Sequence, residues 1–282
     1  MDEALRFARA KKWMKKGLVR LISVCLMIFV MFPFVWLLLS SFKHPVELLS
    51  VPPTVWPKEF TLEYYADLLR NEKVVLALRN SFIVSAATTL ISLAIGIFAS
   101  YVFARLQFRG RKPLYLLIMG TQMLPAMAIL IPMFMLMRVA GLLYTYQGLI
   151  VANVAFSLPY VIWMYAAFIR GLPYEVEEAA RIDGCSRLQI LFRIVVPLSR
   201  SGLAASAIFV FIGVWNEFLF AVVMTQSGTR TLPVQIAEFI GEDRIRYEML
   251  FPASILSCLP VLIVVLIFQK YIIQGLTEGA VK

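Results

Sequence analysis

Six long apolar blocks constrain this chain's fold more than any other feature. They cover about residues 18–41, 80–103, 114–137, 148–169, 203–224 and 251–271. A helix needs ~20 apolar residues to cross a hydrocarbon core ~30 Å thick. Lipid offers the backbone no hydrogen bonds, so each block must be helical or belong to a closed barrel. The runs do not alternate as barrel strands do. The sequence therefore predicts an all-α membrane protein with six transmembrane helices.

The composition agrees with this prediction. Of 282 residues, 61% are hydrophobic and 16% are charged, whereas soluble domains carry about 25% charged residues. The net charge of +10 is concentrated at the ends of the apolar blocks, where headgroups and the membrane potential act on it. We therefore expect a lipid bilayer, and not nucleic acid, around this chain.

Basic residues also predict the topology. Six spans place both termini on one side, and that side holds 18 Lys and Arg residues against 9 on the other. Positively charged loops stay inside, so both termini are expected in the cytoplasm. The first block exceeds the ~7–15 residues of a secretory signal core and lacks an A-x-A-like site, which favours a retained anchor. The predicted organisation is a basic cytoplasmic segment (1–17) and a six-span domain (18–282), with an outer cap (42–79) and a cytoplasmic loop (170–201).

Little in the sequence indicates enzymatic chemistry. The three cysteines show no pairing pattern, and His44 is the only histidine, so neither a disulfide framework nor a metal site is indicated. No nucleophile–base constellation is visible. The G-x-x-x-x-G-K-[ST] phosphate cradle does not occur in the sequence, so any ATP would be handled by a partner.

The loop at 170–201 carries the most specific signal. Pro173 and the acidic residues at 175–178 suit the first turn of a helix, and Gly184 can end it in the left-handed conformation. Ser186 and Gln189 predict a capping box that opens a second helix. The spacing of that helix predicts one buried stripe, formed by Leu188, Leu191, Phe192 and Val195.

At these residues the chain resembles the permeases of ABC importers. Their loop pattern is Glu-Ala-Ala, three residues, Gly, nine residues, then Ile-x-Leu-Pro. Here Glu178-Ala179-Ala180 precedes Gly184 at that spacing, and Ile194 and Pro197 follow, with Val196 in place of the usual Leu. With Asp183 directly before the glycine, the loop pattern resembles the form found in the carbohydrate-uptake branch of the family. The segments W-N-E-F-L-F (215–220) and Q-G-L-T-E-G-A-V-K (274–282) also resemble the maltose/trehalose-type subunit.

The resemblance implies a type I importer permease of a bacterial or archaeal inner membrane. It implies that the loop docks on a cytoplasmic ATPase through Glu177, Glu178, Ala179, Ala180, Asp183, Gly184, Ile194 and Pro197. The chain itself would bind no cofactor and would not be an enzyme, because two ATPase subunits would use ATP–Mg. A second homologous permease, forming a heterodimer, and an extracytoplasmic sugar-binding protein are also implied. The competing interpretation is an ordinary interfacial loop resting on headgroups.

Polar residues inside the spans are candidates for the substrate pathway. An ionised carboxylate near the bilayer centre costs about 2.5–3.5 kcal/mol, so Glu217 should face a cavity or a partner. Amides, carboxylates and aromatic rings suit sugars. An alternative left open is that Asn216 and Glu217 hold helices together. The candidates are Asn153, Trp215, Asn216, Glu217 and Phe218, with Thr121 and Gln122 as weaker ones.

A secondary transporter or channel is the rival function. Such proteins usually carry more ionisable residues within the membrane, whereas Glu217 is the only acidic residue well inside a predicted span. The loop pattern would also stay unexplained. The sequence leaves the cargo open among sugars, polyols and glycerol phosphate.

Overall fold

The computed structural model describes residues 2–241 and 243–278, and most of these residues are helical. Within them the only β-pairing is an isolated bridge between Ile240 and Ile245, which confirms the predicted all-α class. Residues 279–282, the end of the C-terminal motif, lie outside the described residues. The helices are α1 (Asp2–Ser40), α2 (Pro45–Leu48), α3 (Glu63–Arg70), α4 (Glu72–Arg105), α5 (Arg111–Gly120), α6 (Ala126–Val139), α7 (Tyr146–Gly171), α8 (Glu175–Ile182), α9 (Arg187–Ile190), α10 (Val196–Leu198), α11 (Arg200–Trp215), α12 (Leu219–Met224), α13 (Leu232–Ala237) and α14 (Tyr247–Glu278).

The chain divides into two compact units. One comprises Met1–Leu68 and Phe239–Leu256, and the other comprises Leu69–Glu238 and Ser257–Lys282. The second unit contains the predicted loop and the polar residues of the spans. We therefore describe each unit separately and concentrate on the second.

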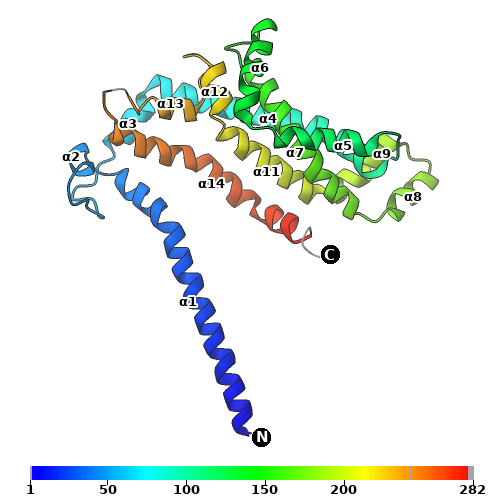
Figure 1. Cartoon of the computed structure of the whole chain (residues 1–282), viewed down its shortest axis with the longest axis horizontal. Coiled ribbons are helices and arrows are strands. Elements are labelled where there is room, and N and C mark those ends of the chain that lie inside the picture. The colour runs from blue at the N-terminus through cyan, green and yellow to red at the C-terminus, as the bar shows by residue number, and fades with distance from the viewer. Residues whose placement is uncertain (1, 242, 279–282) are drawn as a thin grey trace. The chain divides into compact units, whose positions relative to one another are not determined.

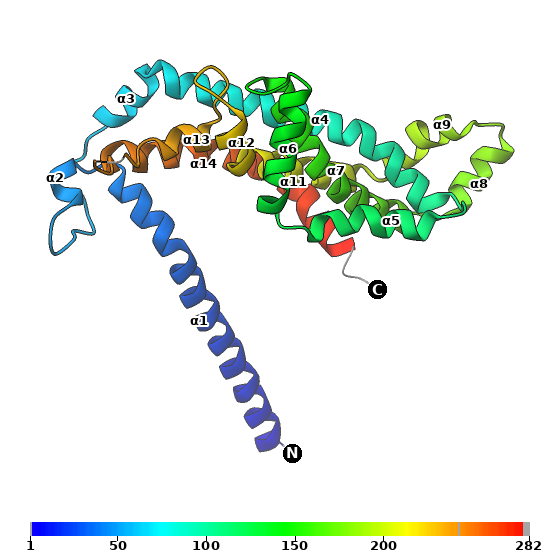
Figure 2. The ribbon, with the colours of Figure 1, turned by 45° about the horizontal axis from the view of Figure 1, so that its top comes forward.

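Three long helices, α4, α7 and α11, lie side by side in the second unit (Figures 1 and 2). Small residues let their backbones approach closely, which is how helices associate in lipid. At Gly96, a Cβ would lie 2.4 Å from Val161 Cγ1, so a larger residue cannot fit without a shift. The sequence analysis did not single out this buried face of α4, which consists of Ser81, Ser85, Thr88, Ser92, Gly96 and Ser100.

The expected span at 114–137 is not one straight helix. Helix α5 and the short 3₁₀ turn Thr121–Met123 meet α6 at 101°, and the two parts are separated by Leu124 and Pro125. Proline lacks an N–H and disfavours helical backbone at the residue before it. Leu124 accordingly adopts φ −76° and ψ 132°. Pro125 therefore divides the predicted span into two helices that meet at an angle.

The expected span at 203–224 is also interrupted. Helix α11 ends at Trp215 and α12 begins at Leu219. Among the described residues, four continuous helices are long and apolar enough to cross a membrane, and there are up to six spans if each of two bent helix pairs counts as one. The other bent pair joins Arg187–Leu198 to Arg200–Trp215 at 79°. A multi-pass membrane protein is therefore confirmed, with spans less regular than predicted.

In the first unit, residues 42–60 fold back on themselves. The Glu47 carboxylate accepts hydrogen bonds from Thr54 Oγ1 at 2.6 Å and from the Lys58 N–H at 3.1 Å. The Thr54 carbonyl accepts from Lys43 Nζ. These bonds lower the pKa of Glu47 below its ordinary value, the Thr54 hydroxyl contributing most. Residues 42–60 are therefore held together locally. Residues 72–79, the end of the predicted cap at 42–79, already belong to α4.

Candidate functional site

The loop at 170–201 contains the predicted helix–turn–helix. Helix α8 ends before Gly184, whose φ of +83° is the left-handed conformation expected there. The capping box is confirmed: the Ser186 N–H donates to Gln189 Oε1 at 2.7 Å, and the Gln189 N–H donates to Ser186 Oγ at 3.4 Å. Pro173 lies before the helix rather than in its first turn, because Tyr174 occupies the N-cap position. Local turn chemistry therefore determines the shape of this loop.

The predicted buried stripe of the second helix is only partly correct. Leu191 and Val195 are buried, but Leu188 and Phe192 are 60% and 49% exposed, and Ile190 is buried instead. Residues 191–195 form a π-helical turn. In such a turn the hydrogen bonds run from i to i+5, which shifts the side-chain register relative to an α-helix. The inward face therefore follows the π turn rather than the expected α-helical spacing.

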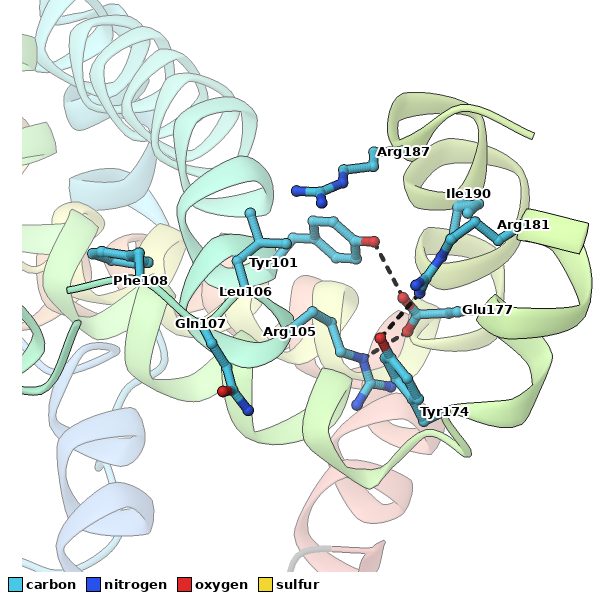
Figure 3. Close-up of a pocket in the computed structure, with 10 residues that line it drawn as sticks. All are labelled: Tyr101, Arg105, Leu106, Gln107, Phe108, Tyr174, Glu177, Arg181, Arg187 and Ile190. Atoms are coloured by element: carbon cyan, nitrogen blue, oxygen red, sulfur yellow. Dashed lines mark hydrogen bonds and ion pairs between the residues drawn. The ribbon is translucent and has the colours of Figure 1, made fainter. Parts of the chain in front are cut away.

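The inner face of α8 is fastened to the end of α4 by a buried ion pair (Figure 3). Arg105 Nε donates to Glu177 Oε1 at 2.6 Å, and the two side chains are only 10% and 3% exposed. The Tyr101 hydroxyl donates to Glu177 Oε2 at 3.1 Å. Arg105 also donates to the Leu172 carbonyl, at 2.9 Å. The sequence analysis placed Glu177 among the docking residues. In the structure Glu177 faces the protein interior and anchors α8 to α4.

The opposite face of α8 is open. Glu178, Ala179, Asp183 and Gly184 are exposed, whereas Ala180 is buried. Ile182, which the sequence analysis missed, is 86% exposed at the end of the helix. Farther along the loop, Ile194 is half-buried and Pro197 is exposed. Ile182 is thus an exposed apolar residue at the end of α8, next to acidic residues, and the inner face of the helix is held by the Glu177–Arg105 ion pair.

A hydrophobic cluster connects this loop to the spans. Tyr165 and Ile169 of α7 pack with Ile190, Leu191 and Val195 of the loop. The Tyr165 hydroxyl also makes a 2.8 Å hydrogen bond with Ser199 Oγ. Because buried packing of this kind resists deformation, displacement of the loop would be passed to α7.

The pathway candidates occupy different environments. Asn153 is buried and its Nδ2 donates to the Leu149 carbonyl of its own helix, at 2.9 Å. Trp215 is buried, and its Nε1–H donates to the Ser257 carbonyl of α14 at 3.0 Å. Within the described residues, no hydrogen bond joins Asn153 to the group at 215–218. Of the weaker candidates, Gln122 Nε2 donates to the Phe156 carbonyl at 3.0 Å and Thr121 Oγ1 to the Ile118 carbonyl at 2.7 Å.

The break between α11 and α12 gives Glu217 a local partner that the sequence analysis did not consider. The first N–H groups of a helix lack partners within it, and lipid supplies none. The Glu217 carboxylate accepts from the Phe220 N–H at 2.6 Å and from the Ala221 N–H at 3.0 Å. Asn216 and Phe218 beside it are exposed. The Glu217 carboxylate therefore stabilises the break, and the Asn216 amide and the Phe218 ring stay exposed beside it.

A second polar cluster, also missed, lies where α4 meets the segment after α12. Asn80 Nδ2 donates to the carbonyls of Gly228 and Arg230, at 3.2 and 2.8 Å. Asn80 Oδ1 accepts from the Tyr146 hydroxyl at 2.7 Å. In the sequence, the only indication of this cluster is that an asparagine lies at the edge of an apolar block. The Asn80 side chain joins three segments that are distant in the chain.

Relatives with similar sequences are permease proteins of transport systems. The trehalose/maltose transport system permease protein MalG of Thermococcus litoralis is 35% identical over 273 residues, which is 95% of this chain and 98% of that protein. The sulfoquinovosyl glycerol transport system permease protein SmoH of Agrobacterium fabrum is 35% identical and covers 89% of each chain.

Solved structures of transporters share the fold. A bacterial ABC transporter involved in the import of the acidic polysaccharide alginate matches with a TM-score of 0.77 at 23% identity, over 90% of this chain and 95% of that chain. The MetNI methionine ABC transporter matches with a TM-score of 0.57 at 20% identity, over 77% and 99%. A family model described as "binding-protein-dependent transport system inner membrane component" matches residues 92–278. The chain belongs to this family of transport permeases.

Proposed function

We propose that this chain is one of two permease subunits in an ATP-driven sugar importer, and that its spans form half of the translocation pathway. The names of its relatives include trehalose/maltose and sulfoquinovosyl glycerol systems, which supports an oligosaccharide, a disaccharide or a related polyol or glycerol phosphate as cargo. The second permease is a different, homologous chain. A sugar-binding protein delivers the cargo from outside.

The observation that carries this proposal is the two-sided construction of α8. Its outer face is open, while its inner face is fastened through Glu177 to Arg105. Ala179 and Gly184 are small, so another backbone can approach closely, and Ile182 offers an apolar contact. We infer that this face docks on a cytoplasmic ATPase, and that two such ATPases use ATP–Mg. Their closure pushes α8, and the anchor transmits the push to α4.

This assignment sets the orientation of the chain. The 170–201 loop and both termini face the cytoplasm, in agreement with the excess of basic residues on that side. The segment at 42–79 then faces outside.

The break at 216–218 is the proposed polar part of the pathway. The Asn216 amide and the Phe218 ring are exposed, and together they can hydrogen-bond and stack on a sugar. The same groups can also contact the second permease. Asn153 is also proposed for the pathway, and it is buried and bonded within its own helix.

Co-purification with the ATPase tests the docking proposal. Glu178→Lys inverts a charge on the exposed face of α8, and Gly184→Pro removes the left-handed conformation that ends it. Both variants should insert normally, lose ATP-dependent uptake and retain less ATPase. The matched control is Glu59→Lys, a charge reversal at an exposed residue of the segment at 42–79. If Glu178→Lys and Gly184→Pro keep wild-type uptake and ATPase, the docking assignment is wrong.

A further inference from the structure

We propose that a pocket between α4, α8 and α9 binds the headgroup phosphate of an anionic phospholipid. The pocket has a volume of about 500 Å³ and opens beside the buried ion pair (Figure 3). The inference rests on the proposed function for the position of this loop at the cytoplasmic leaflet. The lining residues used here are Tyr101, Arg105, Phe108, Glu177, Arg181 and Arg187.

The charge of the lining selects an anion. Three guanidinium groups face one carboxylate, that of Glu177, and this carboxylate is already bonded to Arg105 at 2.6 Å. Arg181 donates to the Tyr174 hydroxyl, a neutral partner, at 3.0 Å. Within the part of the chain that the structure describes, no hydrogen bond or ion pair engages the Arg187 side chain. Two exposed guanidinium groups thus remain for a phosphate, which arginine binds well.

A second, neighbouring pocket adds to the positive charge around the site. It is lined by Gln107, Phe108 and the segment 110–113, which includes Arg111 and Lys112. No acidic residue belongs to its lining. Clusters of basic residues at the cytoplasmic end of membrane helices attract anionic lipids.

The position along the spans matches a headgroup. Arg105 is the last residue of α4, and Leu172, whose carbonyl it binds, is the C-cap residue of α7. Both helices therefore end at this pocket. The ends of transmembrane helices lie at the membrane–water interface, which is where lipid phosphates lie.

An apolar surface nearby distinguishes a lipid from a free anion. Ile91, Ile95 and Phe98 follow the i, i+4, i+7 spacing of one face of α4 and are 42–45% exposed. The Phe98 ring meets the exposed Phe192 ring edge-on, with centroids 5.6 Å apart. Exposed Leu188 follows directly after Arg187 in the chain. This surface can hold an acyl chain while the arginines hold the phosphate.

Direct lipid binding tests the proposal. The full chain, alone and with its ATPase, is purified in neutral detergent and titrated with phosphatidylglycerol or phosphatidylcholine, and native mass spectrometry counts the bound lipids. Arg187→Gln should weaken phosphatidylglycerol binding about fivefold, which corresponds to ~1 kcal/mol for one basic residue near an anionic surface. Arg181→Gln should have a similar effect. The matched control is Arg193→Gln, because Arg193 is an exposed arginine of the same loop outside the pocket lining.

Four outcomes would overturn the proposal. The first is that phosphatidylcholine binds as tightly as phosphatidylglycerol, and the second is that Arg193→Gln lowers binding as much as Arg187→Gln. The third is that inorganic phosphate at the concentration of the lipid displaces it, which would identify a site for free anions. The fourth is that Arg187→Gln releases the ATPase with lipid binding intact, which would assign the pocket to an acidic side chain of that partner. Glu178→Lys separates the two proposals, since it should abolish uptake and still bind the lipid.

Discussion

Replacing Arg105 by methionine removes one half of the buried pair that fastens α8. The Glu177 side chain is 3% exposed and would keep only the Tyr101 hydroxyl as a partner. Breaking a buried pair by removing one partner costs about 3–5 kcal/mol, because a buried charge is left uncompensated. Each 1.4 kcal/mol is tenfold in an equilibrium constant, so the amides of α8 should open and exchange hydrogen more than a hundredfold faster.

Hydrogen–deuterium exchange followed over 173–186 measures this effect. The double variant Arg105→Met/Glu177→Met should recover most of the protection, because an apolar pair of similar volume often replaces a buried ion pair at little cost. Arg193→Met, outside the anchor, should leave α8 unchanged. Unchanged exchange in Arg105→Met, or a double variant that opens more readily than the single one, would refute the anchoring role.

Three further predictions address the topology, the helix break and the segment at 42–60. A membrane-impermeant thiol reagent should label Cys185 in inverted vesicles but not in intact cells, with the other cysteines replaced by serine; labelling in intact cells contradicts the orientation. Glu217→Ala should speed exchange at the Phe220 amide, because an orphaned N–H costs about 1–3 kcal/mol, while Glu217→Gln keeps an acceptor and should have a smaller effect; equal effects would disprove the capping role. Hydrogen bonding, chiefly from Thr54, holds the pKa of Glu47 below 4.5, so Glu47 stabilises residues 42–60 above about pH 4.5 and the stabilisation fades as the pH falls through the lowered pKa. Exchange of this segment should depend on acidic pH in the wild type and less in Glu47→Gln, and identical pH profiles would rule out that contribution.

Features set by neighbouring residues could be predicted from the sequence. Apolar length predicts a membrane helix whatever surrounds it. The left-handed backbone of Gly184 and the capping box of Ser186 and Gln189 depend only on local hydrogen bonds, so these predictions are confirmed. The bend at Pro125 could be predicted too, because proline disfavours helical backbone at the residue before it.

Features set by distant partners could not be predicted. Glu177 is buried because Arg105, 72 residues earlier, meets it, and no periodicity within α8 indicates that pairing. The same holds for Asn80, whose partners Gly228 and Arg230 follow about 150 residues later. The exposure of Leu188 and Phe192 depends on a π turn, which has no reliable sequence pattern. The roles of the 215–218 residues in transport stay predictions.

The close packing of α4 against α7 has a mechanical consequence. Helix α4 has 34 residues, which makes it about 50 Å long. At Gly96 it lies so near Val161 that an added Cβ would clash with the Val161 side chain, so a larger residue there would push the two helices apart. If α8 is pushed toward Arg105, as proposed above, we expect α4 and α7 to move together, so that the displacement reaches the region of Asn80. We expect Gly96→Leu to separate the two helices and to weaken this transmission.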